Sequence, residues 1–251
     1  MLDLSWSFFA IAGPATIFAG FSKGGFGSGA SFAAAAILAL VIQPELALGV
    51  MLPLMMLIDF ASLAPYWKKW LPRVSVLLVL GGLPGVVIGG FVISYADADT
   101  FRILIGLIAL GFVLWQIAQS RGWFRAANRS MPSWAGVFGG TIAGFTSCVS
   151  HAGGPAAAVY LLSLKPTKTE YQATTVIVFW VINIAKFFTY AQLGMFTLET
   201  GQANLALAPF ALFGTWLGVK AHHVMPERLF FAITYVALTV TGTCLVWQGM
   251  T

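Results

Sequence analysis

Charged residues are scarce in this chain of 251 residues. Lys, Arg, Asp and Glu together make up 8% of the sequence, whereas soluble domains carry about 25%. A chain with so few charges cannot present an ordinary surface to water. Apolar runs recur instead from end to end, and 59% of the residues are hydrophobic. The composition predicts an all-α polytopic membrane protein. A β-barrel would need short segments of alternating polarity, which these runs do not show.

Cysteine is also rare, which argues against several chemistries. The only two cysteines, Cys148 and Cys244, lie in apolar context, so a disulfide framework is not indicated. Neither has neighbours at the spacing of a metal site. The net charge of +5 comes from basic residues between apolar runs. Such residues set membrane orientation and do not indicate nucleic-acid binding. We expect no metal, no cofactor, no catalytic residue and no nucleic-acid partner.

Ten apolar segments are apparent in the sequence. They cover roughly 5–20, 29–43, 46–66, 73–94, 100–120, 131–146, 154–165, 171–191, 203–221 and 228–249. A bilayer core of about 30 Å needs roughly 20 helical residues, and the third, fourth, fifth, eighth, ninth and tenth segments meet that length. The first, second, sixth and seventh look short. A glycine-rich stretch joins each short pair, GFSKGGFGSGA at 20–30 and GFTSCVSHAGGPA at 144–156. Whether a short pair crosses twice or is a re-entrant hairpin stays open.

The glycine-rich stretches belong to an internal repeat with an offset of 124 residues. Each half also carries three polar residues spaced i, i+3, i+7, which places them on one helical face. These trios are Asp59, Ser62 and Tyr66, and Asn183, Lys186 and Tyr190. A GxxxG pair occurs in the fourth segment at 85–89 and in the ninth at 214–218. These pairs predict close helix packing.

Basic residues predict the orientation of the repeats. Ten of the 13 Lys and Arg residues should be cytoplasmic: Lys68, Lys69, Arg73, Arg121, Arg125, Arg129, Lys165, Lys168, Lys220 and Arg228. The loops that hold Asp97 and Glu199 should lie outside. Equivalent loops thus have opposite sidedness, which predicts two inverted five-element repeats, 1–122 and 131–251, joined by a cytoplasmic linker at 123–130 within one transmembrane domain, 1–251. Such repeats with paired short helices are typical of transporters with a site near mid-membrane.

The glycine-rich stretches predict an anion-binding site. Irregular backbone at membrane depth is tolerated where it lines a cavity. The second and seventh segments would then begin near mid-membrane, with Ser28 as a candidate cap, and present free N–H groups to an anion. The alternative is that the glycines serve helix packing and the polar residues are satisfied locally. The candidate substrate-binding residues are Lys23, Gly24, Gly25, Gly27, Ser28, Ser150, His151, Gly153, Gly154, Asn183 and Lys186.

Asp59 and Lys186 are ionisable groups at membrane depth, where such groups are costly and are functional candidates. Either they form a structural salt bridge with each other, or Lys186 contributes to anion binding and Asp59 carries a coupling proton. His151 could also titrate near neutral pH, although a lone histidine is more often structural. His222 and His223 are expected in a solvated cytoplasmic loop beside Lys220.

The segment SCVSH at 147–151 also allows an enzymatic interpretation. Its candidate nucleophiles are Ser147, Cys148 and Ser150. His151 would be the base, but neighbouring residues do not easily reach the hydrogen-bond geometry that a nucleophile and base need. Cys148 fits better as a small wall residue. Intramembrane catalysis is therefore the less favoured interpretation.

The chain resembles the sulfite exporter TauE/SafE family of bacterial membrane proteins. The resemblance rests on GFSKGGFGSGASF at 20–32, GFTSCVSHAGGPAAAVYLL at 144–162 and ATTVIVFWVINIAKFFTYAQLG at 173–194. It implies a secondary transporter of small sulfur-containing or carboxylated anions, with the hinge glycines, Lys23 and the face of Asn183 and Lys186 at its site.

We therefore expect a multi-pass protein of the bacterial inner membrane, surrounded by the lipid bilayer. It would export a small anion such as sulfite or an organosulfonate by alternating access, one half rocking against the other. An anion channel is the alternative, and an intramembrane sulfur-handling enzyme a weaker one. The sequence leaves the cargo, the coupling ion and a homodimer open.

Overall fold

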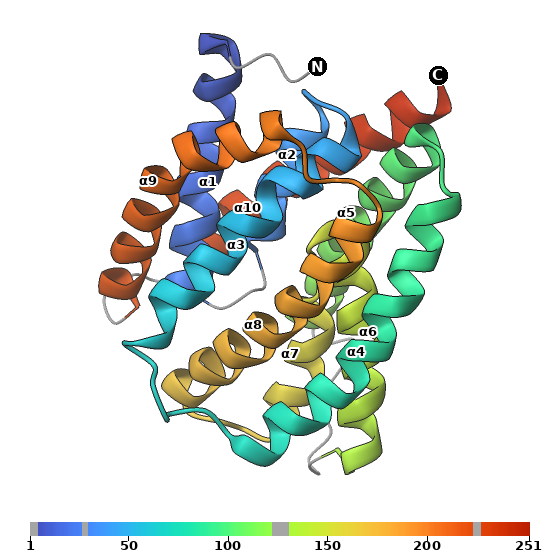
Figure 1. Cartoon of the computed structure of the whole chain (residues 1–251). Helices are drawn as coiled ribbons and strands as arrows, with labels where there is room; N and C mark the ends of the chain where they lie inside the picture. Colours follow the sequence, from blue (N-terminus) through green and yellow to red (C-terminus); the bar gives the residue numbers. More distant parts are fainter. Residues whose placement is uncertain (1–4, 27–29, 122–130, 223–226) are drawn as a thin grey trace.

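The computed structural model of the chain describes residues 5–26, 30–121, 131–222 and 227–251. These residues form an all-α bundle with no strand among them, which confirms the predicted fold class (Figure 1). Its helices are α1 (Trp6–Gly25), α2 (Phe32–Ala39), α3 (Pro44–Leu63), α4 (Pro72–Tyr95), α5 (Ala98–Ser120), α6 (Ser133–Ser150), α7 (Gly154–Ser163), α8 (Lys168–Gln192), α9 (Leu198–Ala221) and α10 (Glu227–Met250). The predicted linker 123–130, and Gly27, Ser28 and His223, lie outside the described residues.

Two helices are too short to cross a bilayer, α2 with 8 residues and α7 with 10. The prediction that the preceding segments are short as well is wrong, because α1 has 20 residues and α6 has 18. α1 continues through Gly20 and Gly24 to Gly25. Glycine weakens a helix that faces water. These glycines are instead buried against α9, where the missing side chain allows close packing.

Four helices, α3, α4, α5 and α8, are long and apolar enough to cross a membrane, as judged over the described residues. The sequence predicted α9 and α10 as well. Each of these has 24 residues, so the predicted length is right. α9 is not among the four, and the fully described part of α10 is too short to be tested. The beginning of α9 is polar, since Glu199, Gln202 and Asn204 lie in its first two turns.

Polar side chains define where several helices begin. Asp97 precedes α5, and its Oδ1 accepts a hydrogen bond from the Thr100 amide at 2.9 Å. Hydrogen bonds from the Thr100 hydroxyl and amide hold the pKa of Asp97 below its usual range. Thr167 and Glu170 form a capping box at the start of α8, and Thr197 caps α9 in the same way. These caps satisfy amide groups that have no partner inside the helix.

Glycines bring helices from different halves of the chain together. On α9, Gly214 and Gly218 lie against the carbonyl groups of Ile17 and Phe21 in α1. On α4, Gly85 lies against the carbonyl group of Thr141 in α6. The close packing predicted from the two GxxxG pairs is thus confirmed. α1 packs mainly on α9, and α6 packs mainly on α4. The first helix of each half therefore contacts the fourth helix of the other half.

A methyl group at Gly85 should destabilise the fold. The Cβ of Gly85→Ala would overlap the Thr141 carbonyl, so α4 and α6 would have to separate. We expect the free energy of unfolding to fall by about 1–3 kcal/mol, as for other overpacked interiors. Gly111→Ala in α5 is the matched control, because no atom lies within 4 Å of its added Cβ. It should stabilise the helix by about 1 kcal/mol. Equal melting temperatures of the two variants in detergent would contradict this packing.

The connections lie at two ends of the bundle (Figure 1). The start of α1, the C-terminus, the α2–α3 connection and the α4–α5 connection lie toward one end, and the α3–α4 connection lies at the other. The loops of Asp97 and Lys68, predicted on opposite sides of the membrane, are thus at opposite ends. α1 starts at the end to which α2 returns, so this pair enters and leaves the bundle on one side.

Candidate functional site

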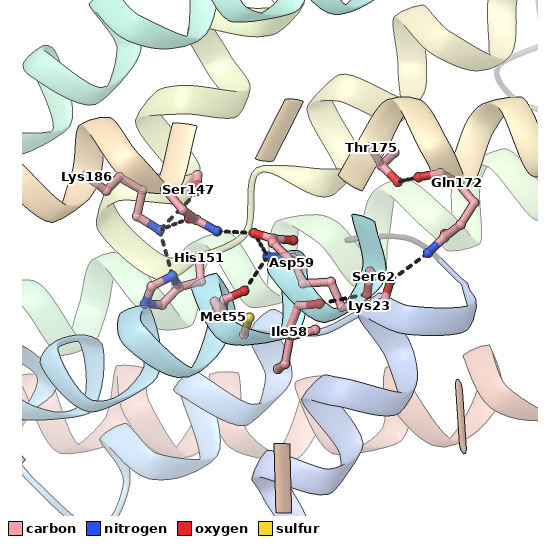
Figure 2. Close-up of polar contacts among 11 residues, drawn as sticks. Lys23, Met55, Ile58, Asp59, Ser62, Ser147, His151, Gln172, Thr175 and Lys186 are labelled. Atoms are coloured by element: carbon pink, nitrogen blue, oxygen red, sulfur yellow. Dashed lines mark hydrogen bonds and ion pairs between the residues drawn. The ribbon is translucent and has the colours of Figure 1, made fainter. Parts of the chain in front are cut away.

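Four buried polar side chains form a continuous chain of contacts across the centre of the bundle (Figure 2). Lys23 Nζ of α1 lies 2.7 Å from Asp59 Oδ2 of α3. The same oxygen accepts a hydrogen bond from Asn183 Nδ2 of α8 at 2.8 Å. Lys186 Nζ, one turn further along α8, donates to Asn183 Oδ1 at 3.3 Å. None of the four is more than 3% exposed. Ionisable groups this deep in an apolar bundle are costly and indicate a functional site.

The two lysines differ in their electrostatic surroundings. Lys23 forms an ion pair with Asp59. Lys186 makes no ion pair with any carboxylate in the described part of the chain. Its three hydrogen-bond partners are neutral atoms: Asn183 Oδ1, Ser147 Oγ at 3.2 Å and His151 Nδ1 at 2.7 Å. The Lys186 ammonium is therefore hydrogen-bonded but not charge-balanced, a costly arrangement that a bound anion would relieve.

The contact with Lys186 couples the tautomer of His151 to the charge of the lysine. A protonated lysine has only donors, so beside it His151 Nδ1 accepts the bond and the proton of the neutral ring lies on Nε2. Nε2 is buried and has no hydrogen-bond partner. His151 also has a φ of 58°, which is uncommon for a residue other than glycine. It caps the C-terminal end of α6 in this left-handed conformation, which turns the chain toward α7.

A small central cavity lies beside this chain of contacts. Its volume is about 10 Å³, and it is lined by Lys23, Ser31, Met55, Ser147, His151, Phe179 and Asn183. A site that holds one water molecule needs roughly this volume. Asp59 Oδ1 is buried nearby without a hydrogen-bond partner. Hydrogen-bond donors of the lining residues and one acceptor, Asp59 Oδ1, thus lie around a small space among buried side chains.

The structure corrects one expectation about this region. The salt bridge considered between Asp59 and Lys186 is not formed, because Asp59 pairs with Lys23 and reaches Lys186 only through Asn183. Lys23 lies in the last turn of α1, and its side chain lines the central cavity. The residue before α2 that lines the central cavity is Ser31, whereas Ser28, the predicted cap, lies outside the described residues.

Three consecutive carbonyl groups at the end of α1 are hydrogen-bonded by side chains from three other elements. Gln172 Nε2 of α8 donates to Lys23 O at 2.6 Å. The Tyr66 hydroxyl, just past α3, donates to Gly24 O at 2.9 Å. His222 Nδ1, just past α9, lies 2.6 Å from Gly25 O. Carbonyl groups at a helix end lack partners inside the helix. These three contacts, which we call the α1 clasp, fasten the helix that carries Lys23.

The clasp has a partial counterpart in the second half. The Tyr190 hydroxyl of α8 donates to Cys148 O of α6 at 2.5 Å. Tyr190 and Cys148 follow Tyr66 and Gly24 by the same 124 residues. Tyr66 was predicted on the same helical face as Asp59, but α3 ends at Leu63 and Tyr66 lies in the following turn. His222 was predicted in a solvated loop and is instead only 2% exposed.

The remaining candidates from the sequence have mainly packing roles. Gly24 and Gly25 lie against the backbone of α9 at Thr215 and Gly218, as the packing alternative proposed. A Cβ at Gly153 would meet Ala143 O at 2.5 Å, so this glycine allows α7 to approach α6. Gly154 is the buried first residue of α7. The Ser150 hydroxyl donates to Thr146 O within α6 at 3.0 Å. Gly27 and Ser28 are not among the described residues.

The sequence interpretation missed Gln172 and Phe179. Both lie on the face of α8 that carries Asn183 and Lys186, since steps of seven, four and three residues separate the four positions. Extending the observed face toward the start of the helix would have found them. Met55 was not detectable in this way, because an apolar residue in an apolar helix gives no signal. The enzymatic interpretation gains nothing, because Cys148 is a buried wall residue against Gly89 of α4.

Comparison with known proteins shows similarity over nearly the whole chain. The family model described as "Sulfite exporter TauE/SafE" matches residues 12–245. Neither the curated proteins nor the solved structures include a match to the chain.

Proposed function

The chain belongs to the sulfite exporter TauE/SafE family, and from this premise we propose that it exports a small anion, sulfite or an organosulfonate, across the bacterial inner membrane. The family is one of membrane transporters, and the four long apolar helices indicate an integral membrane protein. The finer proposal is that transport occurs by alternating access around the central cavity. Matching contacts at an offset of 124 residues support the inverted repeat on which this mechanism depends.

The observation that carries the proposal is the buried Lys186 ammonium without a carboxylate counter-ion among the described residues. An anion bound next to it would balance its charge in a medium of low dielectric constant, where the attraction is strong. His151 Nε2 supplies a donor without a protein partner. Asn183 and Ser147 line the same cavity and bring hydrogen-bonding groups to it. These residues, rather than the hinge glycines, form the proposed anion site.

Lys23 and Asp59 have a different role in this proposal. An anion that binds at Lys23 would compete with Asp59, because the Asp59 carboxylate already balances the charge of Lys23. A proton delivered to Asp59 would remove the competing charge and release Lys23 to bind the anion. The pair thus offers a route to proton coupling. Export of an anion is also favoured by an interior-negative potential, by about 2.3 kcal/mol per charge for each 100 mV.

The size of the central cavity supports a mechanism with moving helices. A volume of about 10 Å³ does not admit sulfite with its three oxygen atoms. The α1 clasp ties α1 to α8 next to this space, since Gln172 holds the carbonyl group of Lys23, whose side chain lines it. In this proposal, access requires α1 to move relative to α8. A permanently open channel would not need a closed cavity of this kind.

Counterflow in proteoliposomes tests the proposal. Vesicles that contain the purified protein are loaded with unlabelled sulfite, and uptake of external radiolabelled sulfite is followed in time. An alternating-access transporter gives a transient accumulation of label above equilibrium, because the site returns to the outside carrying unlabelled internal sulfite and can then bind labelled sulfite again. Sulfoacetate, taurine and acetate compared as internal anions would rank the cargo. Flux without such accumulation would favour the anion channel, and chemical conversion of the label would favour the enzyme.

A further inference from the structure

A second, larger cavity lies on the other side of the α1 clasp. Its volume is about 490 Å³, and its walls come from the end of α1, from α5 and α7, from the start of α8 and from α10. We call it the peripheral cavity. It lies among elements whose ends and connecting loops hold basic residues: Lys165 in the α7–α8 loop, Lys168 at the start of α8 and Arg121 after α5. By the charge rule this is the cytoplasmic side.

The wall of the peripheral cavity is mostly apolar and aromatic. Phe26, Phe112, Trp115 and Tyr235 contribute rings, and α7 contributes small aliphatic side chains. Such a wall suits the apolar part of an organic molecule. A volume of some hundreds of Å³ is typical of sites for small organic molecules.

The polar groups of the cavity select for negative charge. Lys168 lies in its lining, where Nζ donates a hydrogen bond to His222 O at 2.5 Å and lies 5.7 Å from the centre of the Phe26 ring. No described lining residue is acidic. Gln172 adds a polar atom deep in the wall. Its Nε2 is used in the α1 clasp, while its Oε1 is buried without a hydrogen-bond partner. Because buried polar atoms are normally hydrogen-bonded, this oxygen indicates a missing donor, such as a hydroxyl or amino group of a ligand.

We propose that the peripheral cavity is a binding site for an organic anion with an apolar body, a sulfonate or carboxylate, which waits there before it reaches the central cavity. The acidic group would lie near Lys168, and the apolar body against the rings of Phe112 and Trp115. This inference rests on the proposed transport function and narrows the cargo from sulfite to organic anions. Gln172 connects the two cavities directly, because it lines one and holds the backbone of Lys23, which lines the other.

Titration calorimetry on the purified protein in detergent tests the proposal, with 4-hydroxybenzenesulfonate as the probe. Ala158→Phe fills the peripheral cavity from α7 without removing a polar group. It should weaken binding of the probe at least tenfold. Ala156→Phe is the matched control, because Ala156 lies on the same helix but lines only a neighbouring apolar groove between α5, α6 and α7. The groove shares Trp115, Pro155 and Val159 with the peripheral cavity but not Ala158. Its dissociation constant should stay within about twofold of wild type. Phenol, which lacks the sulfonate, should bind at least tenfold more weakly than the probe.

Further variants distinguish binding at the peripheral cavity from binding at the central cavity. Lys168→Gln changes an exposed residue, so it should fold, and it should weaken binding of the probe about fivefold. Lys186→Gln should leave binding at the peripheral cavity unchanged. Loss of probe binding in Lys186→Gln, or equal affinity of Ala158→Phe and wild type, would overturn the peripheral site. If probe binding follows the expected pattern but counterflow is absent, the transport function fails while the binding site stands.

Discussion

Sulfite transport should fall by about two orders of magnitude when Lys186 is replaced by glutamine. The substitution removes the one charge at the centre that Asp59 does not balance directly. Loss of one partner of a buried charged contact costs about 2–5 kcal/mol, and about 2.7 kcal/mol corresponds to a hundredfold change. Initial rates of sulfite efflux from proteoliposomes would measure the effect.

The stability of Lys186→Gln distinguishes an anion site from a structural lysine. A buried ammonium without a counter-ion is unfavourable, so its neutral replacement should keep or raise the melting temperature. Lys220→Gln is the control for net charge. Lys220 lies at the end of α9 with Nζ 3.9 Å from the centre of the Trp216 ring, away from the central cavity. That variant should transport normally. A drop in melting temperature with full transport in Lys186→Gln would assign the residue to structure alone.

Asp59→Asn is expected to be the most destabilising single change at the centre. It leaves Lys23 buried without its carboxylate partner, and breaking a buried ion pair in this way costs about 3–5 kcal/mol. The double variant Lys23→Gln/Asp59→Asn should recover most of that loss, because both charges are then absent. Thermal unfolding of the wild type, the two single variants Lys23→Gln and Asp59→Asn, and the double variant forms a complete cycle that measures the coupling.

Transport by the double variant Lys23→Gln/Asp59→Asn distinguishes a structural role of this ion pair from a role in proton coupling. If Lys23 and Asp59 only hold α1 to α3, the recovered protein should transport sulfite as wild type does. If they form the proton-dependent switch proposed above, the protein should be stable but its transport should no longer respond to a pH gradient. The measurement is efflux with and without an imposed pH difference. Wild-type coupling in the stable double variant would remove Asp59 from the mechanism.

Helix number and candidate residues followed from the sequence, but contacts between helices did not. Ten apolar runs became ten helices in the described chain because hydrophobic length is a strong signal in a membrane protein. The extension of α1 through Gly24 and Gly25 was missed, because glycine reads as a hinge until its packing partner is known. Charge pairing was missed for a similar reason. Periodicity placed Asp59 and Lys186 on facing helices, but only the three-dimensional arrangement brings Lys23 to Asp59.

The packing of α1 on α9 and of α6 on α4 limits how the two halves of the chain can fold and move. The glycine interfaces of α1 and α6 are each shared between 1–122 and 131–251, because α1 packs on α9 and α6 packs on α4. The two halves of the chain are therefore interlocked and do not lie side by side as separate bodies. A displacement of α1 that opens the clasp must slide along α9 or carry it along, so a moving unit would combine helices from both ends of the gene product. We expect that neither half of a chain built this way folds without the other.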